Sequence, residues 1–174
     1  MGGGTLDVVF PGLVARADVA PGEGRVRLAL RPPKLLGEMV LPVADRRFAA
    51  STWRVGVIHV VVEVPGPELD RLPLERFAAA TEDATTVTDP NVTLVAGSGE
   101  RLRIRTRERG AGETLACGSA ALAAAAWRGT PGMPVEVVPP GGTSLRVRVD
   151  GSAEAVLEGP ARIVFRGTWA PFPA

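Results

Sequence analysis

The only cysteine of the chain, Cys117, stands where a glycine-rich turn gives way to a run of alanines. The run 120–127 consists of apolar residues and good helix formers, and Arg128-Gly129 closes it, so the pattern predicts a helix that begins at Cys117. A thiol in the first helical turn lies beside unpaired N–H groups at the positive end of the helix dipole. That position lowers the pKa of a cysteine and provides N–H groups for a carboxylate or phosphate. The alternative is that Cys117 is a small buried hydrophobe.

A strand with two contrasting faces leads up to this turn. Every odd position from 101 to 109 is arginine, whereas the even positions carry Leu102, Ile104, Thr106 and Glu108. Period-two alternation predicts a strand, and we expect the arginine face to be solvated surface. A carboxylate on the apolar side needs a partner, for which Arg109 and a ligand ammonium group are candidates. We expect Glu113 to accept N–H bonds where the helix begins.

Two other polar residues are the only ones of their type. His59 is the sole histidine and lies in an apolar run, while Asn91 is the sole asparagine and follows Pro90. A histidine in such a run is more often packed and hydrogen-bonded than catalytic, and an asparagine after proline is often a turn residue; functional roles stay open for both. No Cys/His/acid cluster has metal-ligand spacing and no phosphate-binding loop is present, so we expect neither metal nor cofactor.

Glycine and proline divide most of the chain into short predicted strands. A longer strand, buried on both faces, is predicted over 52–64, and a helix within 72–81. Asp150-Gly151 indicates a hairpin. The remaining strands are predicted over 5–10, 13–19, 25–30, 135–138, 145–149, 154–157 and 163–168. Many strands and two helices, one of them central and alanine-rich, predict an α+β fold in which a curled or barrel-type sheet wraps around the central helix.

The composition of the 174 residues is that of a globular protein, with 45% hydrophobic and 22% charged residues and a net charge of +1. This charge argues against nucleic acid or an anionic membrane as partner. No apolar run is long enough to span a bilayer, and a single cysteine fits a reducing cytoplasm. All basic residues except Lys34 are arginine, and proline is abundant at 16, which is thermophile-like or reflects a GC-rich genome.

The string 108–119 closely resembles the C-terminal signature of the diaminopimelate epimerases, a family of cofactor-independent amino-acid epimerases. Further segments match this family in order and approximate spacing: 25–30, 56–59, 91–92, 140–142 and 158–160. The resemblance covers nearly the whole chain but only the later two-thirds or so of such an enzyme, whose first part carries a cysteine of its own. It implies a complete lobe over 32–160, with 1–31 and 161–174 as remnant strands of a first lobe.

The family inverts the α-carbon with two thiols on opposite faces, converting LL- to meso-diaminopimelate in lysine and cell-wall biosynthesis. By resemblance, Cys117 is one of these thiols, and the backbone N–H groups of Gly118 and Ser119 bind the α-carboxylate. Glu108 and Arg109 match an acidic–basic pair that contacts the substrate.

The resemblance also assigns Asn91 to substrate binding and places His59 as the last residue of the family's Gly-Asn-Pro-His motif. Val57 and Ile58 replace the two middle residues, of which the asparagine contacts substrate. Recognition of diaminopimelate is therefore in question.

Without a second cysteine, we expect a cytoplasmic amino-acid epimerase that is incomplete alone. It would act as a homo-oligomer or with a separate chain that supplies the missing lobe, and its other partner is a small-molecule amino acid. The alternatives are a non-catalytic amino-acid-binding protein, a one-base isomerase that uses Glu108, and a decayed or truncated homologue.

Overall fold

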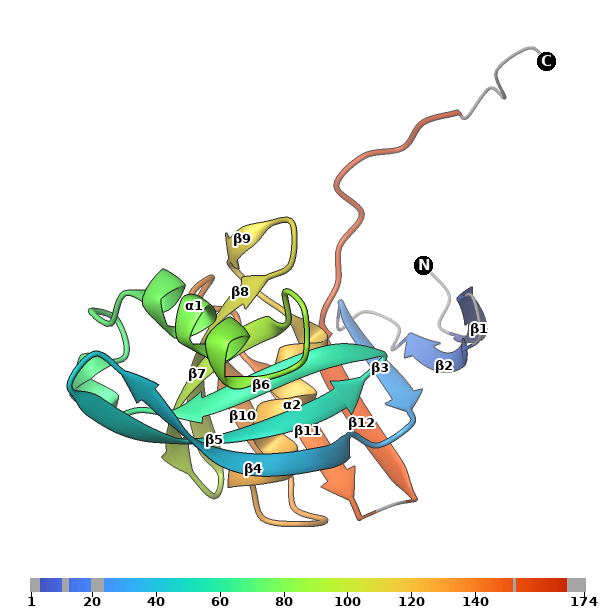
Figure 1. Cartoon of the computed structure of the whole chain (residues 1–174). Helices are drawn as coiled ribbons and strands as arrows, with labels where there is room; N and C mark the ends of the chain where they lie inside the picture. Colours follow the sequence, from blue (N-terminus) through green and yellow to red (C-terminus); the bar gives the residue numbers. More distant parts are fainter. Residues whose placement is uncertain (1–3, 11–12, 20–23, 152, 169–174) are drawn as a thin grey trace.

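The computed structural model describes residues 4–10, 13–19, 24–151 and 153–168. These residues form a sheet of twelve strands that curls around helix α2 (Gly118–Arg128), while helix α1 (Leu74–Ala84) packs on the other side of the sheet (Figure 1). The predicted α+β fold with a curled sheet around a central helix is confirmed. No helix in the described part of the chain is long and apolar enough to cross a membrane.

The path through the sheet is β1-β2-β3-β12-β11-β10-β8-β7-β6-β5-β4, and β9 pairs with β8. Neighbours are antiparallel except for β6 with β7 and β8 with β10, which are parallel. A short 3-10 helix spans Gly66–Glu68. The strands are β1 (Gly4–Phe10), β2 (Leu13–Val19), β3 (Arg25–Leu30), β4 (Lys34–Val43), β5 (Arg46–Val55), β6 (Val57–Glu63), β7 (Asn91–Ser98), β8 (Arg101–Glu108), β9 (Gly112–Thr114), β10 (Val135–Val138), β11 (Leu145–Asp150) and β12 (Glu154–Pro160).

Helix α2 is buried on all sides. The six residues 120–125 are all buried, and the helix contacts strands from β5 to β8 and from β10 to β12. A helix surrounded by protein must be apolar around its whole circumference. Alanine meets this demand with side chains small enough for the sheet to close around the helix, which explains the predicted alanine run.

The central strands separate two hydrophobic cores. On β6, Val61 faces the α2 core, whereas Val60 and Val62 face a second core beneath α1. Helix α1 contributes Leu74, Phe77 and Ala78 to that second core, as its predicted apolar stripe requires. A strand covered on both faces reads as a continuous apolar run, which is the pattern of residues 60–62.

Two strand predictions are wrong. The run 52–64 is not one strand, because the chain reverses at Gly56, whose φ of +74° suits glycine, and β5 pairs antiparallel with β6 across this turn. The predicted strand 163–168 does not form either. Residues 161–168 are exposed and pair with no strand among the described residues, apart from a hydrogen bond from the Ala161 N–H to the Gly24 carbonyl, and a segment without a strand partner cannot form the hydrogen bonds of a strand.

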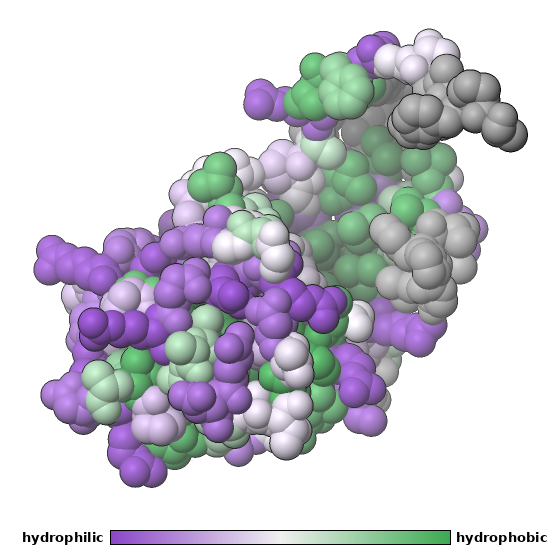
Figure 2. Space-filling model, turned by 45° about the horizontal axis from the view of Figure 1, so that its top comes forward, coloured by the Kyte–Doolittle hydropathy of each residue, from purple (hydrophilic) through white to green (hydrophobic). Residues whose placement is uncertain are grey.

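The N-terminal strands belong to the same continuous sheet. The hairpin β1–β2 joins β3, and β3 pairs antiparallel with β12 along its whole length. The predicted boundary near residue 32 therefore falls within one sheet and stays a prediction. Apolar surface gathers at this end of the molecule, over the N-terminal strands and the segment 161–168 (Figure 2). Exposed large apolar side chains include Leu6, Leu115, Ile163, Val164 and Phe165.

Candidate functional site

Cys117 is the N-cap residue of α2, as the sequence predicts. Its backbone is extended, with φ −139° and ψ 112°, and its carbonyl accepts the first helical hydrogen bond, from the Ala121 N–H at 3.0 Å. The side chain is only 6% exposed. Both interpretations of Cys117 are thus partly met, because the thiol is buried and also lies at the start of a helix.

Three polar residues lie in one row across the inner face of the sheet, which faces α2. His59 of β6 is in register with Asn91 of the parallel strand β7. Asn91 lies one position beyond the pair formed by Val92 and Arg107, so Glu108 of β8 is its neighbour on the other side. Alternation places all three side chains on the inner face, with Val61 and Ile104 of the α2 core.

A chain of short contacts connects this row to the thiol. The Cys117 Sγ lies 3.3 Å from Ser119 Oγ, which lies 3.0 Å from His59 Nε2. The same Nε2 lies 3.4 Å from Asn91 Nδ2, and Asn91 Oδ1 accepts a hydrogen bond from the Arg109 N–H at 2.8 Å. The structure therefore brings together five of the predicted site residues: Cys117, Ser119, His59, Asn91 and Arg109.

Gly118, between Cys117 and Ser119, packs closely against a leucine side chain of β12. A Cβ on residue 118 would lie 2.9 Å from Leu157 Cδ2 of β12. Glycine therefore allows β12 to pack against the first turn of α2, where the N–H groups proposed to hold a carboxylate are found.

Glu108 does not pair with Arg109, which was one candidate from the sequence. Its Oε1 instead accepts a hydrogen bond of 2.6 Å from the Thr114 hydroxyl on the neighbouring strand β9. Arg109 is exposed and contributes its backbone N–H to Asn91. The carboxylate of Glu108 is held by a neutral donor and lies close enough to Cys117 to act on its pKa.

Burial raises the pKa of the Cys117 thiol above its ordinary value. A hydrogen bond donated to the sulfur by the Ala120 N–H lowers the pKa, as does one from the Ser119 hydroxyl when that hydroxyl is the donor. A hydrogen bond between the thiol and Glu108, together with the charge of this carboxylate, raises the pKa further. The prediction of an activated thiolate is wrong for this structure. Removing the sulfur from water raises the thiol pKa by more than the groups at the helix N-terminus lower it. Cys117 is a protonated thiol near neutral pH.

Burial also lowers the pKa of His59 to about 4, against a smaller opposing effect of the Glu108 charge. The imidazole is completely buried and neutral near pH 7. Its Nδ1 has no hydrogen-bond partner within the described ranges. His59 is thus packed and hydrogen-bonded through Nε2, and a functional role for it stays a prediction.

The arginine face of β8 is more ordered than a solvated surface. Arg105 pairs with Glu113 at 2.7 Å and donates to the carbonyls of Leu69 and Leu72. Arg107 pairs with Asp89 at 2.7 Å. Glu113 does not cap α2 as we expected, since the bidentate guanidinium of Arg105 holds it on the outer face.

A hollow of about 410 Å³ opens beside the site and is large enough for an amino acid. Its polar lining residues are Thr88, Asp89, Asn91, Glu108, Arg109 and Ser119. Cys117 does not line the hollow but contacts Ser119, which does. The start of β6 also lines the hollow, with Val57 and Ile58. The wall is therefore apolar where the resemblance places the substrate-binding asparagine of the family.

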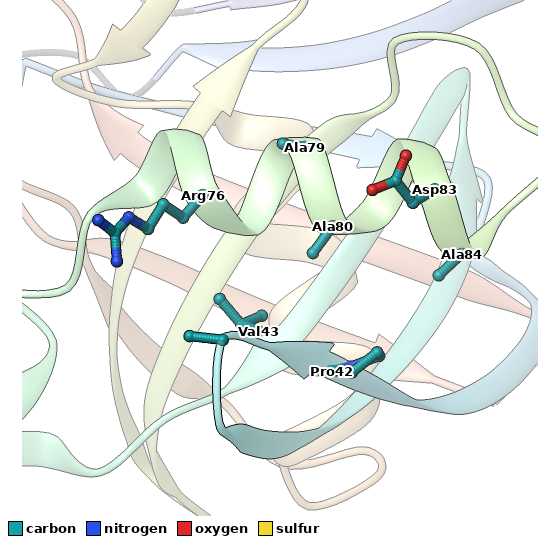
Figure 3. Close-up of a pocket in the computed structure, with 8 residues that line it drawn as sticks. Pro42, Val43, Arg76, Ala79, Ala80, Asp83 and Ala84 are labelled. Carbon is teal, nitrogen blue, oxygen red and sulfur yellow. The ribbon is translucent and has the colours of Figure 1, made fainter.

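A second hollow, between β4 and α1, is lined by Val43 and by the small side chains of Ala79, Ala80 and Ala84 (Figure 3). Arg76 and Asp83 extend from α1 beside it. None of the predicted site residues is part of this lining, so the candidate site is the hollow beside α2.

The fold is that of known amino-acid racemases and epimerases. A crystal structure of a hydroxyproline epimerase from Agrobacterium vitis, with bound trans-4-hydroxy-L-proline, superposes with a TM-score of 0.63 and 14% sequence identity. The match covers 91% of this chain and 56% of that protein. At this identity the likeness concerns the fold alone.

The sequence defines the family within that fold. Residues 51–164 match the diaminopimelate epimerase family, and the chain belongs to this family. The diaminopimelate epimerase of Xylella fastidiosa strain M23 is 43% identical over 143 residues, which are 79% of this chain and 49% of that protein. An O-ureido-serine racemase from Streptomyces lavendulae is 40% identical over 130 residues, or 71% and 43% of the two chains. The chain thus spans about half the length of the curated relatives it matches.

Proposed function

We propose that this chain is the Cys117-bearing part of an amino-acid epimerase that transfers a proton at the α-carbon of diaminopimelate without a cofactor. The observation that carries the proposal is the thiol at the start of a buried helix, beside Glu108 and within contact of Ser119. Membership of the diaminopimelate epimerase family and the hollow beside α2 support it. We place this activity in the cytoplasm, since one cysteine forms no internal disulfide.

In this proposal the substrate α-carboxylate binds the N–H groups of Gly118 and Ser119 at the N-terminus of α2. Asn91, Glu108 and Arg109 contact the remaining polar groups of the amino acid. With the stereoisomer whose α-hydrogen faces Cys117, the minor thiolate form of this residue takes the α-proton, so that the C–H bond breaks and an S–H bond forms; with the other stereoisomer the resting thiol donates its proton. The electron pair stays on the α-carbon, where the bound carboxylate and the helix N–H groups stabilise it. Inversion requires a proton from a donor on the opposite face.

That donor is expected outside these 174 residues, because Cys117 is their only cysteine. A separate chain that carries the first lobe, or a second copy of this chain, is the proposed source. In this division 32–160 forms the complete lobe, and 1–31 and 161–174 belong with the first lobe. The exposed apolar side chains of Ile163, Val164 and Phe165 support a covering partner.

Isotope exchange tests the function directly. Each stereoisomer of diaminopimelate is incubated with the pure chain in deuterium oxide, and both α-deuterium content and configuration are followed. We expect deuterium uptake with retained configuration, which is lost in Cys117→Ala. Inversion by the pure chain would mean that it contains a second base besides Cys117. Glu108 would be the first residue to test for that role.

Binding without exchange, measured by calorimetry, would favour a non-catalytic amino-acid-binding protein. Absence of both binding and exchange, in a chain that is folded by circular dichroism, would favour a decayed or truncated homologue. Adding the first lobe of a relative as a separate chain provides the positive control, because inversion should then appear only with Cys117 intact.

A further inference from the structure

We infer that His59 and Asn91 are positioning residues, which orient the Ser119 hydroxyl so that it accepts a hydrogen bond from Cys117 and keeps this residue a proton donor. The role of Cys117 as a proton donor in catalysis rests on the proposed function. The hydrogen bond between Cys117 and Ser119 does not, and it is tested on this chain without a substrate.

The orientation begins at Asn91, because the polypeptide backbone fixes its amide. The Arg109 N–H is a donor only, and it lies 2.8 Å from Asn91 Oδ1. The other end of the amide, Nδ2, therefore faces His59 Nε2 at 3.4 Å. An amide NH₂ group can only donate, so Nε2 of His59 presents its lone pair.

The lone pair on Nε2 in turn fixes Ser119. A neutral imidazole with an unprotonated Nε2 carries its proton on Nδ1, which is the buried atom without a partner among the described residues. Ser119 Oγ lies 3.0 Å from Nε2 and must donate to it. A serine hydroxyl has one proton, so toward Cys117 Sγ, at 3.3 Å, Ser119 can only accept. The one proton left for this contact is that of the Cys117 S–H group, which has two acceptors, Ser119 Oγ and the carboxylate of Glu108.

The other groups near the sulfur are compatible with a hydrogen bond donated by the Cys117 S–H to Ser119. The Ala120 N–H faces the sulfur from α2, and Glu108 of β8 is the charged group that acts on it within the described part of the chain. A carboxylate cannot donate a proton to a thiolate, and it therefore also favours the thiol. Because the Ser119 proton is donated to His59 Nε2, the Ala120 N–H is left as the group that favours the thiolate.

A catalytic consequence follows for the proposed epimerase. Cys117 begins the reaction as the acid: its S–H bond breaks, the proton forms the new C–H bond, and the thiolate remains. The base that first removes the α-proton then lies on the opposite face. The resting protein is thus set for the stereoisomer whose α-hydrogen points away from Cys117.

The effect of Ser119→Ala on the thiol decides the inference. Because the chain has one cysteine, thiolate absorbance and alkylation rate against pH report on Cys117 alone. If Ser119 accepts from the thiol, its removal destabilises the thiol, and the apparent pKa falls by about half a unit. A rise would mean that Ser119 donates to the thiolate, and an unchanged value would mean that the contact has no effect. Either result overturns the inference.

A second background tests the roles of His59 and Ser119 together. In His59→Leu the hydroxyl loses its acceptor and is free to donate to the thiolate, so adding Ser119→Ala should now raise the pKa. The same downward shift in both backgrounds would show that His59 does not orient Ser119. Thr93→Val is the matched control, since it removes a buried hydroxyl that contacts Thr106 on the same inner face and should leave the titration unchanged. If His59→Leu does not fold, the sign of the pKa shift caused by Ser119→Ala in the wild-type background still shows whether Ser119 accepts from Cys117 or donates to it.

Discussion

Leu157 of β12 lies against Gly118 so closely that a Cβ on residue 118 would be 2.9 Å from Leu157 Cδ2. This contact packs the first turn of α2 against β12. The turn that carries Cys117, Gly118 and Ser119 therefore depends on a strand close to it in space but distant in sequence. A change at either residue should reach the thiol.

Gly118→Val should destabilise the folded chain by roughly 1–3 kcal/mol, because the added methyl groups overpack the contact with Leu157. Denaturant unfolding measures the loss. Combining it with Leu157→Ala should restore part of the stability, although Leu157→Ala alone leaves a cavity. If the losses of unfolding free energy in Gly118→Val and Leu157→Ala simply add in the double variant, the two residues do not clash directly.

Glu108→Gln should lower the pKa of Cys117, because it removes the negative charge that opposes the thiolate. Alkylation near neutral pH should then be faster than in wild type, and the pH–rate profile should shift downward. Glu136→Gln is the control, since Glu136 pairs with Arg101 on the surface. A faster reaction in both variants would point to a general loosening of the fold.

The stability of the chain should fall as the pH drops from about 6.5 to about 4. The unfolded chain protonates His59 near its ordinary pKa of 6.5, whereas the folded chain resists until about 4, so protons favour unfolding in this window. The full loss is roughly 3 kcal/mol. Comparing unfolding of wild type and His59→Gln at several pH values isolates this contribution from that of the carboxyl groups. Parallel pH profiles would contradict it.

Val57→Asn should strengthen binding of diaminopimelate, because the family's asparagine at this position contacts the substrate. The side chain lines the hollow and is 42% exposed, so the change is expected to preserve the fold. Calorimetry with the two proteins measures the gain, and Val40→Asn, on the exposed edge strand β4, controls for surface polarity. Equal affinity in wild type and Val57→Asn would remove Val57 from the recognition of this substrate.

Phe165→Asp should reduce self-association or partner binding. Phe165 is 81% exposed in the segment that follows β12, beside Ile163 and Val164, and a charge there opposes burial. Light scattering of wild type, Phe165→Asp and the conservative Phe165→Leu gives the comparison. If the wild-type chain is a monomer that binds no first-lobe chain, this segment is not a docking surface.

The elements predicted best from the sequence are those with a strong local pattern. The alanine run predicts α2, and alternation predicts β8, because in each case local periodicity and burial agree. Strand β4 was not predicted, since an exposed edge strand with Gly37 and Pro42 lacks both alternation and a continuous apolar run.

The site required tertiary information at two points. His59 and Asn91 are 32 residues apart and meet only because β6 and β7 are parallel and in register, which no local pattern specifies. The unusual pKa of Cys117 depends on how deeply the sheet encloses α2. The position of Cys117 in the sequence predicts that the helix dipole lowers its pKa. It does not predict the larger, opposite effect of burial.

The two cores share one wall, formed by β5, β6 and β7, with Val60 facing α1 and Val61 facing α2. A shared wall ties the two helices into a single cooperative unit, since neither core can open without disturbing strands that the other requires. The amide protons of β6 and β7 should exchange with solvent only through global unfolding. Substitutions in the core beneath α1 should therefore also affect the site on the inner face of the sheet. Phe77, which does not line the candidate site, helps to hold the strands that carry it.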